Sequence, residues 1–151
     1  MKEVRHSLLQ RLPALSALLT VASLAACRGG SVDGEADLVP VPQINSLSPV
    51  TVSFCLRVDD GEGLEVTVRN QGTGTASDSP VRVVFSGVPP PTPPNTMTGG
   101  QLDPGEIAIL TFQIPLGCFG ADCGFTILVD PDDVITESNE GNNTADGDCI
   151  G

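Results

Sequence analysis

The side chains best able to do chemistry are crowded into one segment, Leu128 to Asn143, which reads LVDPDDVITESNEGNN. Five of its carboxylates offer the oxygen ligands that calcium prefers: Asp130, Asp132, Asp133, Glu137 and Glu140. Their spacing is not that of an EF-hand, because Val134 and Ile135 stand where that loop needs an oxygen ligand and a glycine. Two hypotheses remain: a calcium site of another kind, or a turn that holds two strands together.

In the structural hypothesis, the beginning of the segment folds on itself. Asp130 precedes Pro131, so its carboxylate can cap the N–H group of Asp132 or Asp133 in an Asx turn. Val134 and Ile135 form an apolar pair, which we expect to pin the loop onto the end of the fold.

The rest of the segment is equally suited to a structural turn, through Glu137, Asn139, Glu140, Asn142 and Asn143. The asparagines can donate to backbone carbonyls and tolerate left-handed geometry, which Gly141 adopts freely. The glutamates can accept backbone N–H groups or pair with an arginine such as Arg69 or Arg82. We predict that this segment is a structural turn, and a calcium site is the alternative.

Enzymatic function is the weakest hypothesis. The only histidine is His6 and the only lysine is Lys2, both close to the N-terminus. Serine triads, Cys–His pairs, His-ligated zinc and Schiff-base chemistry are therefore not available to the rest of the chain. A carboxylate pair could hydrolyse a glycoside, but the chain has no Trp or Tyr to hold a sugar. We expect no catalytic residue and no cofactor other than the alternative calcium.

Residues 1–26 have the pattern of a secretory signal peptide. Lys2, Arg5 and Arg11 precede an apolar run of fifteen residues, 12–26, which is too short to span roughly 30 Å of hydrocarbon. The run ends in Leu24-Ala25-Ala26-Cys27, which resembles the lipobox of bacterial lipoproteins. That resemblance implies lipid attachment at Cys27, followed by a short tether over residues 27–35. Arg28 follows the cysteine, where an inner-membrane retention signal typically has Asp, so we expect the outer membrane or the cell surface.

Residues 28–151 are strongly acidic, with four arginines against eighteen acidic residues and a formal charge of −14. Nucleic acids and anionic membrane surfaces are poor partners for such a field, so we expect membrane contact through the lipid only. The charge suits cations or basic protein patches, and it also keeps a surface protein soluble.

Four cysteines follow the signal: Cys55, Cys118, Cys123 and Cys149. An even number in an exported chain indicates disulfides, with three possible connectivities. The simplest assignment joins Cys118 to Cys123 across a turn, which leaves Cys55 for Cys149. Both bridges would be structural, since the spacing is not the C-x-x-C of redox enzymes.

Alternation of apolar and polar residues predicts strands over residues 36–44, 51–58, 63–70, 80–88, 106–115, 124–130 and 144–151, and a weak strand over 96–102. Prolines 40 and 42 favour an edge position for the first of these. No segment after the signal reads as a helix. Seven or eight short strands separated by turns predict an all-β fold, an antiparallel β-sandwich forming one domain over residues 36–151.

Several of these segments, taken in order, resemble the CARDB family, the cell-adhesion-related domain found in bacteria. They are ADLV at 36–39, VTVRNQGTGTA at 66–76, LDPGE at 102–106 and VDPDDVITESNEGNNT at 129–144. The most specific pieces are NQG at 70–72 and ESNEGNN at 137–143. The resemblance covers residues 36–151 and implies an immunoglobulin-like sandwich on an exported, surface-displayed protein.

The sequence therefore predicts a non-catalytic, lipid-anchored module for interaction or adhesion, with a protein or surface polymer of the cell envelope as its partner. One alternative is a structural envelope lipoprotein that assembles with a larger complex. Another is a calcium-dependent binding domain.

Overall fold

The structure, a computed structural model, describes residues 34–45, 51–88, 95–119 and 123–149. The signal peptide predicted over residues 1–26, Cys27 and nearly all of the predicted tether lie outside these ranges. Ser31–Gly151 forms one compact unit. None of the helices in the described ranges is long and apolar enough to cross a membrane.

One sheet is built around β5 (Gly63–Asn70), the longest of its strands. β5 pairs on one side with β8 (Ile107–Gln113), and on the other with both β1 (Leu38–Val41) and β4 (Arg57–Val58). All of these pairings are antiparallel. Because β1 pairs only with β5 among the described strands, Pro40 stands in an edge strand, as the sequence predicts.

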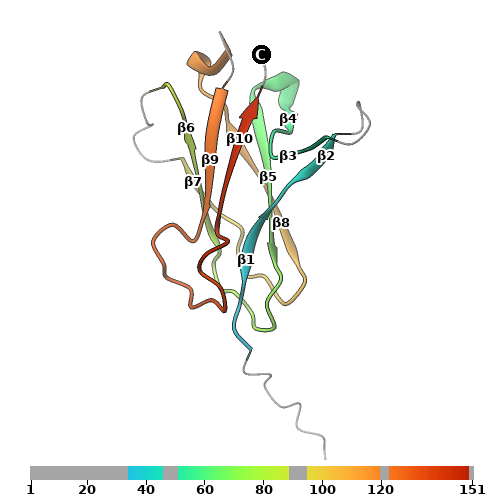
Figure 1. Cartoon of the computed structure of the whole chain (residues 1–151), viewed down its shortest axis with the longest axis vertical. Helices are drawn as coiled ribbons and strands as arrows, with labels where there is room; N and C mark the ends of the chain where they lie inside the picture. Colours follow the sequence, from blue (N-terminus) through green and yellow to red (C-terminus); the bar gives the residue numbers. More distant parts are fainter. Residues whose placement is uncertain (1–33, 46–50, 89–94, 120–122, 150–151) are drawn as a thin grey trace, which may run out of the picture. The chain divides into compact units, whose positions relative to one another are not determined.

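The second sheet has the order β10-β9-β6-β7, formed by β10 (Thr144–Cys149), β9 (Cys123–Val129), β6 (Pro80–Phe85) and β7 (Thr96–Thr98). A small two-stranded sheet is formed by β2 (Gln43–Asn45) and β3 (Thr51–Ser53). Two short 3-10 turns complete the elements, η1 (Asp59–Gly61) between β4 and β5 and η2 (Leu116–Phe119) before β9. Figure 1 shows the two larger sheets as two layers.

The core lies between these layers and follows the alternation of the sequence. The inward residues of the first sheet include Leu64, Val66, Val68, Leu110 and Phe112, and those of the second include Val81, Val83, Phe85, Phe125, Ile127 and Val129. All of them are buried. The all-β, antiparallel fold is thus confirmed, and the apolar positions of these strands face inward as predicted.

Three strand predictions were wrong, and the described residues contain ten strands rather than seven or eight because two of the predicted strands are each divided. Residues 36–44 are divided into β1 and β2, which pair with β5 and β3 respectively. Residues 51–58 are divided into β3 and β4, which pair with different partners. The Oγ of Ser53 accepts the N–H of Cys55 at 3.0 Å, a local turn that interrupts the extended chain. The strand expected over 96–102 ends at Thr98, since the two glycines that follow turn the chain toward Ser79.

Two disulfides occur, Cys55–Cys149 and Cys118–Cys123, which is the pairing expected from the sequence. Cys149 is the last residue of β10, and Cys55 lies two residues before the start of β4. The first bridge therefore ties one sheet to the other, while the second closes the η2 turn locally.

Candidate functional site

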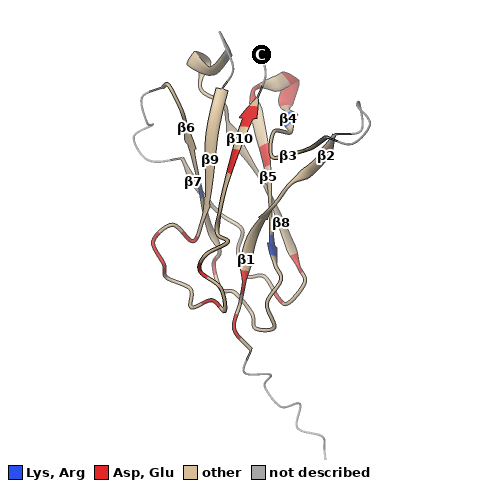
Figure 2. Ribbon diagram, in the orientation of Figure 1, with Lys and Arg blue, Asp and Glu red and all other residues tan. Residues whose placement is uncertain are grey.

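The acidic segment connects β9 to β10 and lies at the end of the sandwich where β1 begins (Figures 1 and 2). Two other stretches meet it there: the N-terminal residues 35–38 and the loop after β5, residues 70–75. We call this assembly the clamp, because the acidic segment and the loop hold the N-terminal stretch from two directions.

Asp130 organises the start of the acidic segment. Its carboxylate accepts the N–H groups of Val134 (3.2 Å) and Ile135 (2.7 Å), while its own N–H donates to the Pro80 carbonyl at 2.8 Å. The predicted cap is present, but it reaches two residues further than Asp132 and Asp133, because Asp130 adopts a positive φ of 42° and starts a wider turn. Both carboxylate oxygens of Asp130 are occupied by backbone donors.

The apolar pair that follows Asp130 is divided between core and solvent. Ile135 is buried, whereas Val134 is 70% exposed. The expectation that both pin the loop was wrong for Val134, since the Asp130 turn directs only Ile135 toward the core.

Glu137 bonds directly to the first residue of β1. It is 7% exposed; one carboxylate oxygen accepts the N–H of Leu38 and the other accepts Asn143 Nδ2 at 2.7 Å. The adjacent Ser138 N–H donates to the Ala36 carbonyl at 2.8 Å, so the segment forms a short parallel bridge to the N-terminal stretch. Neither Arg69 nor Arg82 is needed to pair this carboxylate.

Burial raises the pKa of Glu137 above its ordinary value, and the nearby carboxylates of Glu140 and Asp130 add to this effect. The hydrogen bonds from Leu38 and Asn143 act in the opposite direction. Removal from water outweighs these donors, so the clamp contains a carboxyl group that resists ionisation.

The other members of the turn form short-range bonds. Glu140 Oε1 accepts the N–H of Glu137 at 2.8 Å, and Asn139 Oδ1 accepts that of Gly141 at 3.1 Å. Asn142 Nδ2 donates to Asp37 Oδ1 at 2.8 Å. The expected asparagine bonds to backbone carbonyls are not seen among these described contacts, because the carboxylates nearby are stronger acceptors.

The expected left-handed geometry also falls on other residues. In the described part of this segment, positive φ occurs at Asp130 and Asp133, not at the asparagines or Gly141. Short acidic side chains that bond locally tolerate that region, and Asp130 does so through its two backbone donors.

The second arm of the clamp depends on Asn70, whose role the sequence reasoning missed. Asn70 is fully buried, and its Oδ1 accepts the N–H groups of Asp37 (3.1 Å) and Gly72 (3.0 Å). Its Nδ2 donates to the carbonyls of Gly74 (2.7 Å) and Leu102 (2.9 Å). One side chain therefore joins three stretches of backbone. The only signal was NQG itself, an Asn at the end of a strand and two residues before a glycine.

Gly72 is required where the loop after β5 meets the N-terminal stretch. A Cβ atom at this position would lie 2.5 Å from the Asp37 nitrogen and the Glu35 oxygen. Beside it, the N–H groups of Gln71 and Thr73 donate to the carbonyls of Asp37 and Glu35 at 2.8 and 3.0 Å. The loop can approach the N-terminal stretch this closely only because residue 72 has no side chain.

The five calcium candidates do not form a ligand set. Both oxygens of Asp130 and of Glu137 accept hydrogen bonds from the protein, and Asp132 pairs with Arg82 at 3.1 Å. Across the described ranges, no group of three or more Asp, Glu, His or Cys residues is placed to hold a metal ion. Asp133 and Glu140 do line a surface depression of about 320 Å³.

The CARDB family model matches residues 58–146. The structure is similar to a domain of a Methanosarcina acetivorans protein provisionally named as a cell surface protein, with a TM-score of 0.55, 23% identity, and coverage of 77% of this chain and 91% of that one. It is also similar to the CARDB domain of a Pyrococcus furiosus protein in complex with di-metal ions, with a TM-score of 0.51, 23% identity, and coverage of 77% and 93%.

None of the curated proteins matches the chain. The two structural likenesses, at this level of identity, establish the fold alone. The family match extends from the last residue of β4 into β10, and includes NQG and the acidic segment. The chain belongs to the CARDB family.

Proposed function

We propose that this protein is a non-catalytic interaction module that a lipid on Cys27 holds at the cell surface. Three observations support the proposal: membership of the CARDB family, the cell-surface name of the Methanosarcina relative, and the Leu24-Ala25-Ala26-Cys27 pattern. The clamp is the observation that carries it, because it holds residues 35–38, through which the chain coming from Cys27 enters the sandwich.

A tethered domain takes the pull of its anchor through the residues by which the chain enters the fold, here the stretch from Glu35 to Leu38. That stretch is held by Glu137 and Ser138 on one side and by the Asn70 loop on the other. These hydrogen bonds connect residues 35–38 to the loop after β9 in one sheet and to the loop after β5 in the other. A force applied through the tether is therefore shared between the two sheets. A clamp in this position suits a domain displayed on a tether.

A catalytic role for the same carboxylates is disfavoured by their contacts. A general acid or nucleophile needs an oxygen directed at a substrate. Both oxygens of Glu137 and of Asp130 accept backbone or side-chain donors of the protein. In this proposal they are structural groups.

Fatty-acid labelling in a bacterial host tests the anchor. The full chain should incorporate labelled palmitate and fractionate with the outer membrane, where a protease added to intact cells reaches it. Cys27→Ser should abolish labelling, whereas Ser31→Ala, a nearby change outside the lipobox, should leave it intact. An unlabelled wild-type protein released into the medium would refute the anchor while leaving the fold untouched.

The kind of interaction is tested with the disulfide-intact domain. Binding to foreign cells or to matrix polymer, saturable and abolished by unfolding the domain, supports an adhesion module. Recovery of one stoichiometric envelope protein instead supports the alternative, a structural lipoprotein within a larger assembly.

A second candidate function is cation binding, at a site with fewer ligands than the five carboxylates considered first. One unpaired oxygen atom favours it. Asn143 is buried, and its Oδ1 has no hydrogen-bond partner within the described structure. It lines the same depression as the carboxylates of Asp133 and Glu140, which gives three oxygen donors of the kind that calcium accepts. Thermal unfolding with calcium or a chelator decides between this site and a clamp without metal.

A further inference from the structure

The edges of the two larger sheets differ in how well they are protected from pairing with another chain. β1 contains Pro40, β10 contains Asp146 and Asp148, and β7 has only three residues. Prolines, charges and short length are the usual ways in which natural sheets block edge-to-edge association. β8, with the sequence IAILTFQ, has seven residues and none of these features.

β8 also presents an apolar outer face beside its open edge. Ile107 and Ile109 are 54% and 57% exposed, and β8 pairs only with β5 in the described structure. The flanking bonds, Asn70 N–H to the Glu106 carbonyl and Ile114 N–H to the Glu62 carbonyl, show that even-numbered residues bond to β5. The N–H and C=O groups of Ile107, Ile109, Thr111 and Gln113 therefore point toward the open edge.

These outward groups can pair with their own copies. In an antiparallel pair centred on Leu110, Ile107 of one copy faces Gln113 of the other, and Ile109 faces Thr111. Every one of these residues bonds outward, so the strand pairs along its full length. No charged residue lies in β8, so this arrangement places no like charges opposite each other across the two central strands.

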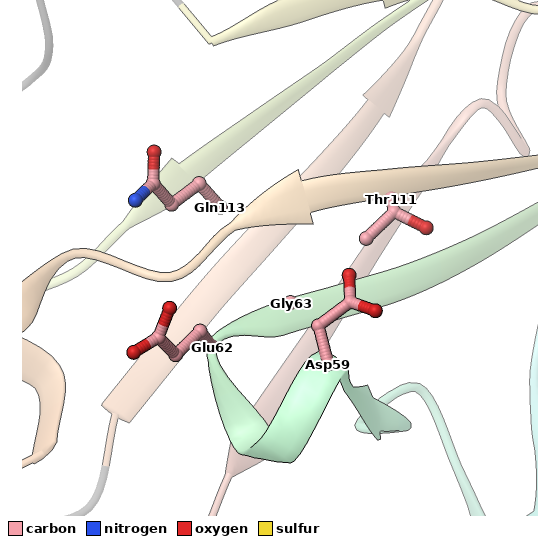
Figure 3. A pocket seen from close by; sticks show the side chains of 5 residues that line it. All are labelled: Asp59, Glu62, Gly63, Thr111 and Gln113. Atoms are coloured by element: carbon pink, nitrogen blue, oxygen red, sulfur yellow. The ribbon is translucent and has the colours of Figure 1, made fainter.

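Charges on the outer faces of the two copies are complementary in the same arrangement. Arg69 on β5 is opposite Ile107, it is exposed, and it forms no ion pair with the described residues. At the other end of that face, Asp59 and Glu62 border a pocket of about 260 Å³ that Thr111 and Gln113 of β8 also line (Figure 3).

Pairing Ile107 with Gln113 of the second copy brings Arg69 level with that copy's acidic pocket. Arg69 and the start of β5 in the second copy are about three strand spacings apart, roughly 14 Å, and the extended arginine and a carboxylate side chain reach toward each other across the two β8 strands. Twofold symmetry repeats this contact between Arg69 and the acidic pocket at the other end of the paired β8 strands. We infer that a second copy of this chain docks on β8, with Arg69 of each copy in the pocket formed by Asp59 and Glu62 of the other.

This inference does not depend on the lipid anchor or on the clamp. It joins the two first sheets into one continuous sheet, and it gives the pocket at η1 a ligand of defined chemistry, a guanidinium group. Two tethered copies would then meet the surface together, each with its own anchor.

A pair of charge reversals tests the docking in residues 31–151, which form a compact unit with its own core and both disulfides. Sedimentation of the wild type should show a mass that rises from one copy to two with concentration. Arg69→Glu alone and Glu62→Arg alone should each weaken self-association at least tenfold. An equimolar mixture of the two variants should recover it, because each mixed dimer restores both Arg–carboxylate contacts.

Both substitutions are at exposed positions, and melting curves matching that of the wild type confirm that each variant is folded. Ile109→Lys should also abolish the dimer, whereas Val134→Lys, an equally exposed change in the acidic segment, should not. A wild type that remains a monomer up to millimolar concentration would overturn the inference. A dimer that survives Ile109→Lys, or a variant mixture that stays monomeric, would overturn it as well.

Discussion

Two buried polar side chains, Asn70 and Glu137, determine how the N-terminal stretch is attached. Each is removed from solvent, and each reaches backbone groups far away in the sequence: Glu137 bonds to Leu38, and Asn70 to Leu102. Buried polar groups that are completely satisfied rigidify a fold, whereas a partner left unpaired costs its full desolvation. Stability should therefore depend on these residues more than on the exposed acids around them.

Replacement of Asn70 by alanine removes the partner of two half-buried donors, the N–H groups of Asp37 and Gly72, and of two buried acceptors, of which only the Leu102 carbonyl keeps another donor, the N–H of Ala76. We expect a loss of about 3 kcal/mol or more in the free energy of unfolding, measured in urea. Asn139→Ala, which removes a single exposed bond to Gly141, should cost less than about 1 kcal/mol. Equal effects of the two substitutions would show that Asn70 does not join the loops.

The raised pKa of Glu137 predicts a specific dependence on pH. The folded domain keeps the proton of Glu137 to a higher pH than the unfolded chain does. The stability from this protonated group is therefore fully present below the unfolded pKa and is lost as the pH rises through the folded pKa.

Unfolding of the wild type and of Glu137→Gln between pH 4 and pH 7 checks this effect. As the pH falls, the wild type should gain stability relative to the variant. Ser138→Ala, which removes no ionisable group, should differ from the wild type by a constant amount. A Glu137→Gln difference that is flat, or that grows in favour of the variant at low pH, would contradict the prediction.

At the scale of elements, the two disulfides have different consequences. Cys55–Cys149 closes a sequence separation of 94 residues and joins the sheets, whereas Cys118–Cys123 closes a separation of 5. The entropy removed from the unfolded chain grows with loop length. The longer bridge should therefore contribute more.

Removing Cys55–Cys149 by paired Cys→Ala changes should lower the free energy of unfolding by about 4–5 kcal/mol, and removing Cys118–Cys123 by about 2 kcal/mol. Calorimetry of the two double variants at neutral pH measures both. A larger loss from the short bridge would mean that η2, rather than chain entropy, governs the effect.

The strands were predictable from sequence because their signal is local. Leu64, Val66 and Val68 alternate with polar residues, and this pattern alone determines which face is buried. For the clamp, the sequence predicted only that the acidic segment forms a structural turn, not which residues it contacts. That Asp130 would cap a turn follows from Asp-Pro, but its donors, Val134 and Ile135, depend on the φ that Asp130 adopts.

The contacts of Asn70 and Glu137 could not be predicted in the same way. Asn70 bonds to Leu102, which is 32 residues away in the sequence, and Glu137 bonds to Leu38, which is 99 residues away. Only the assembled sheets bring these residues together. The division of residues 51–58 was missed for a similar reason, since β3 and β4 pair with different strands.

At the scale of the whole molecule, the chain is an acidic β-sandwich of the CARDB family, with acidic residues on its loops and also on strands such as β10 (Figure 2). In our account, the acidic segment stabilises the domain by bonding to its N-terminal stretch, and it does so without a metal ion. The protein would then be displayed on its tether with the same stability in the presence and absence of calcium.

Thermal unfolding of residues 28–151, with disulfides formed, in calcium and in chelator tests this claim most directly. Our account predicts that the two curves coincide. Saturation of a cation site at a hundredfold above its dissociation constant would add about 2.7 kcal/mol. In a domain of this size, that would raise the midpoint by about 10 °C or more. Such a rise would show that the domain binds calcium and would contradict the account in which the acidic segment acts without a metal ion.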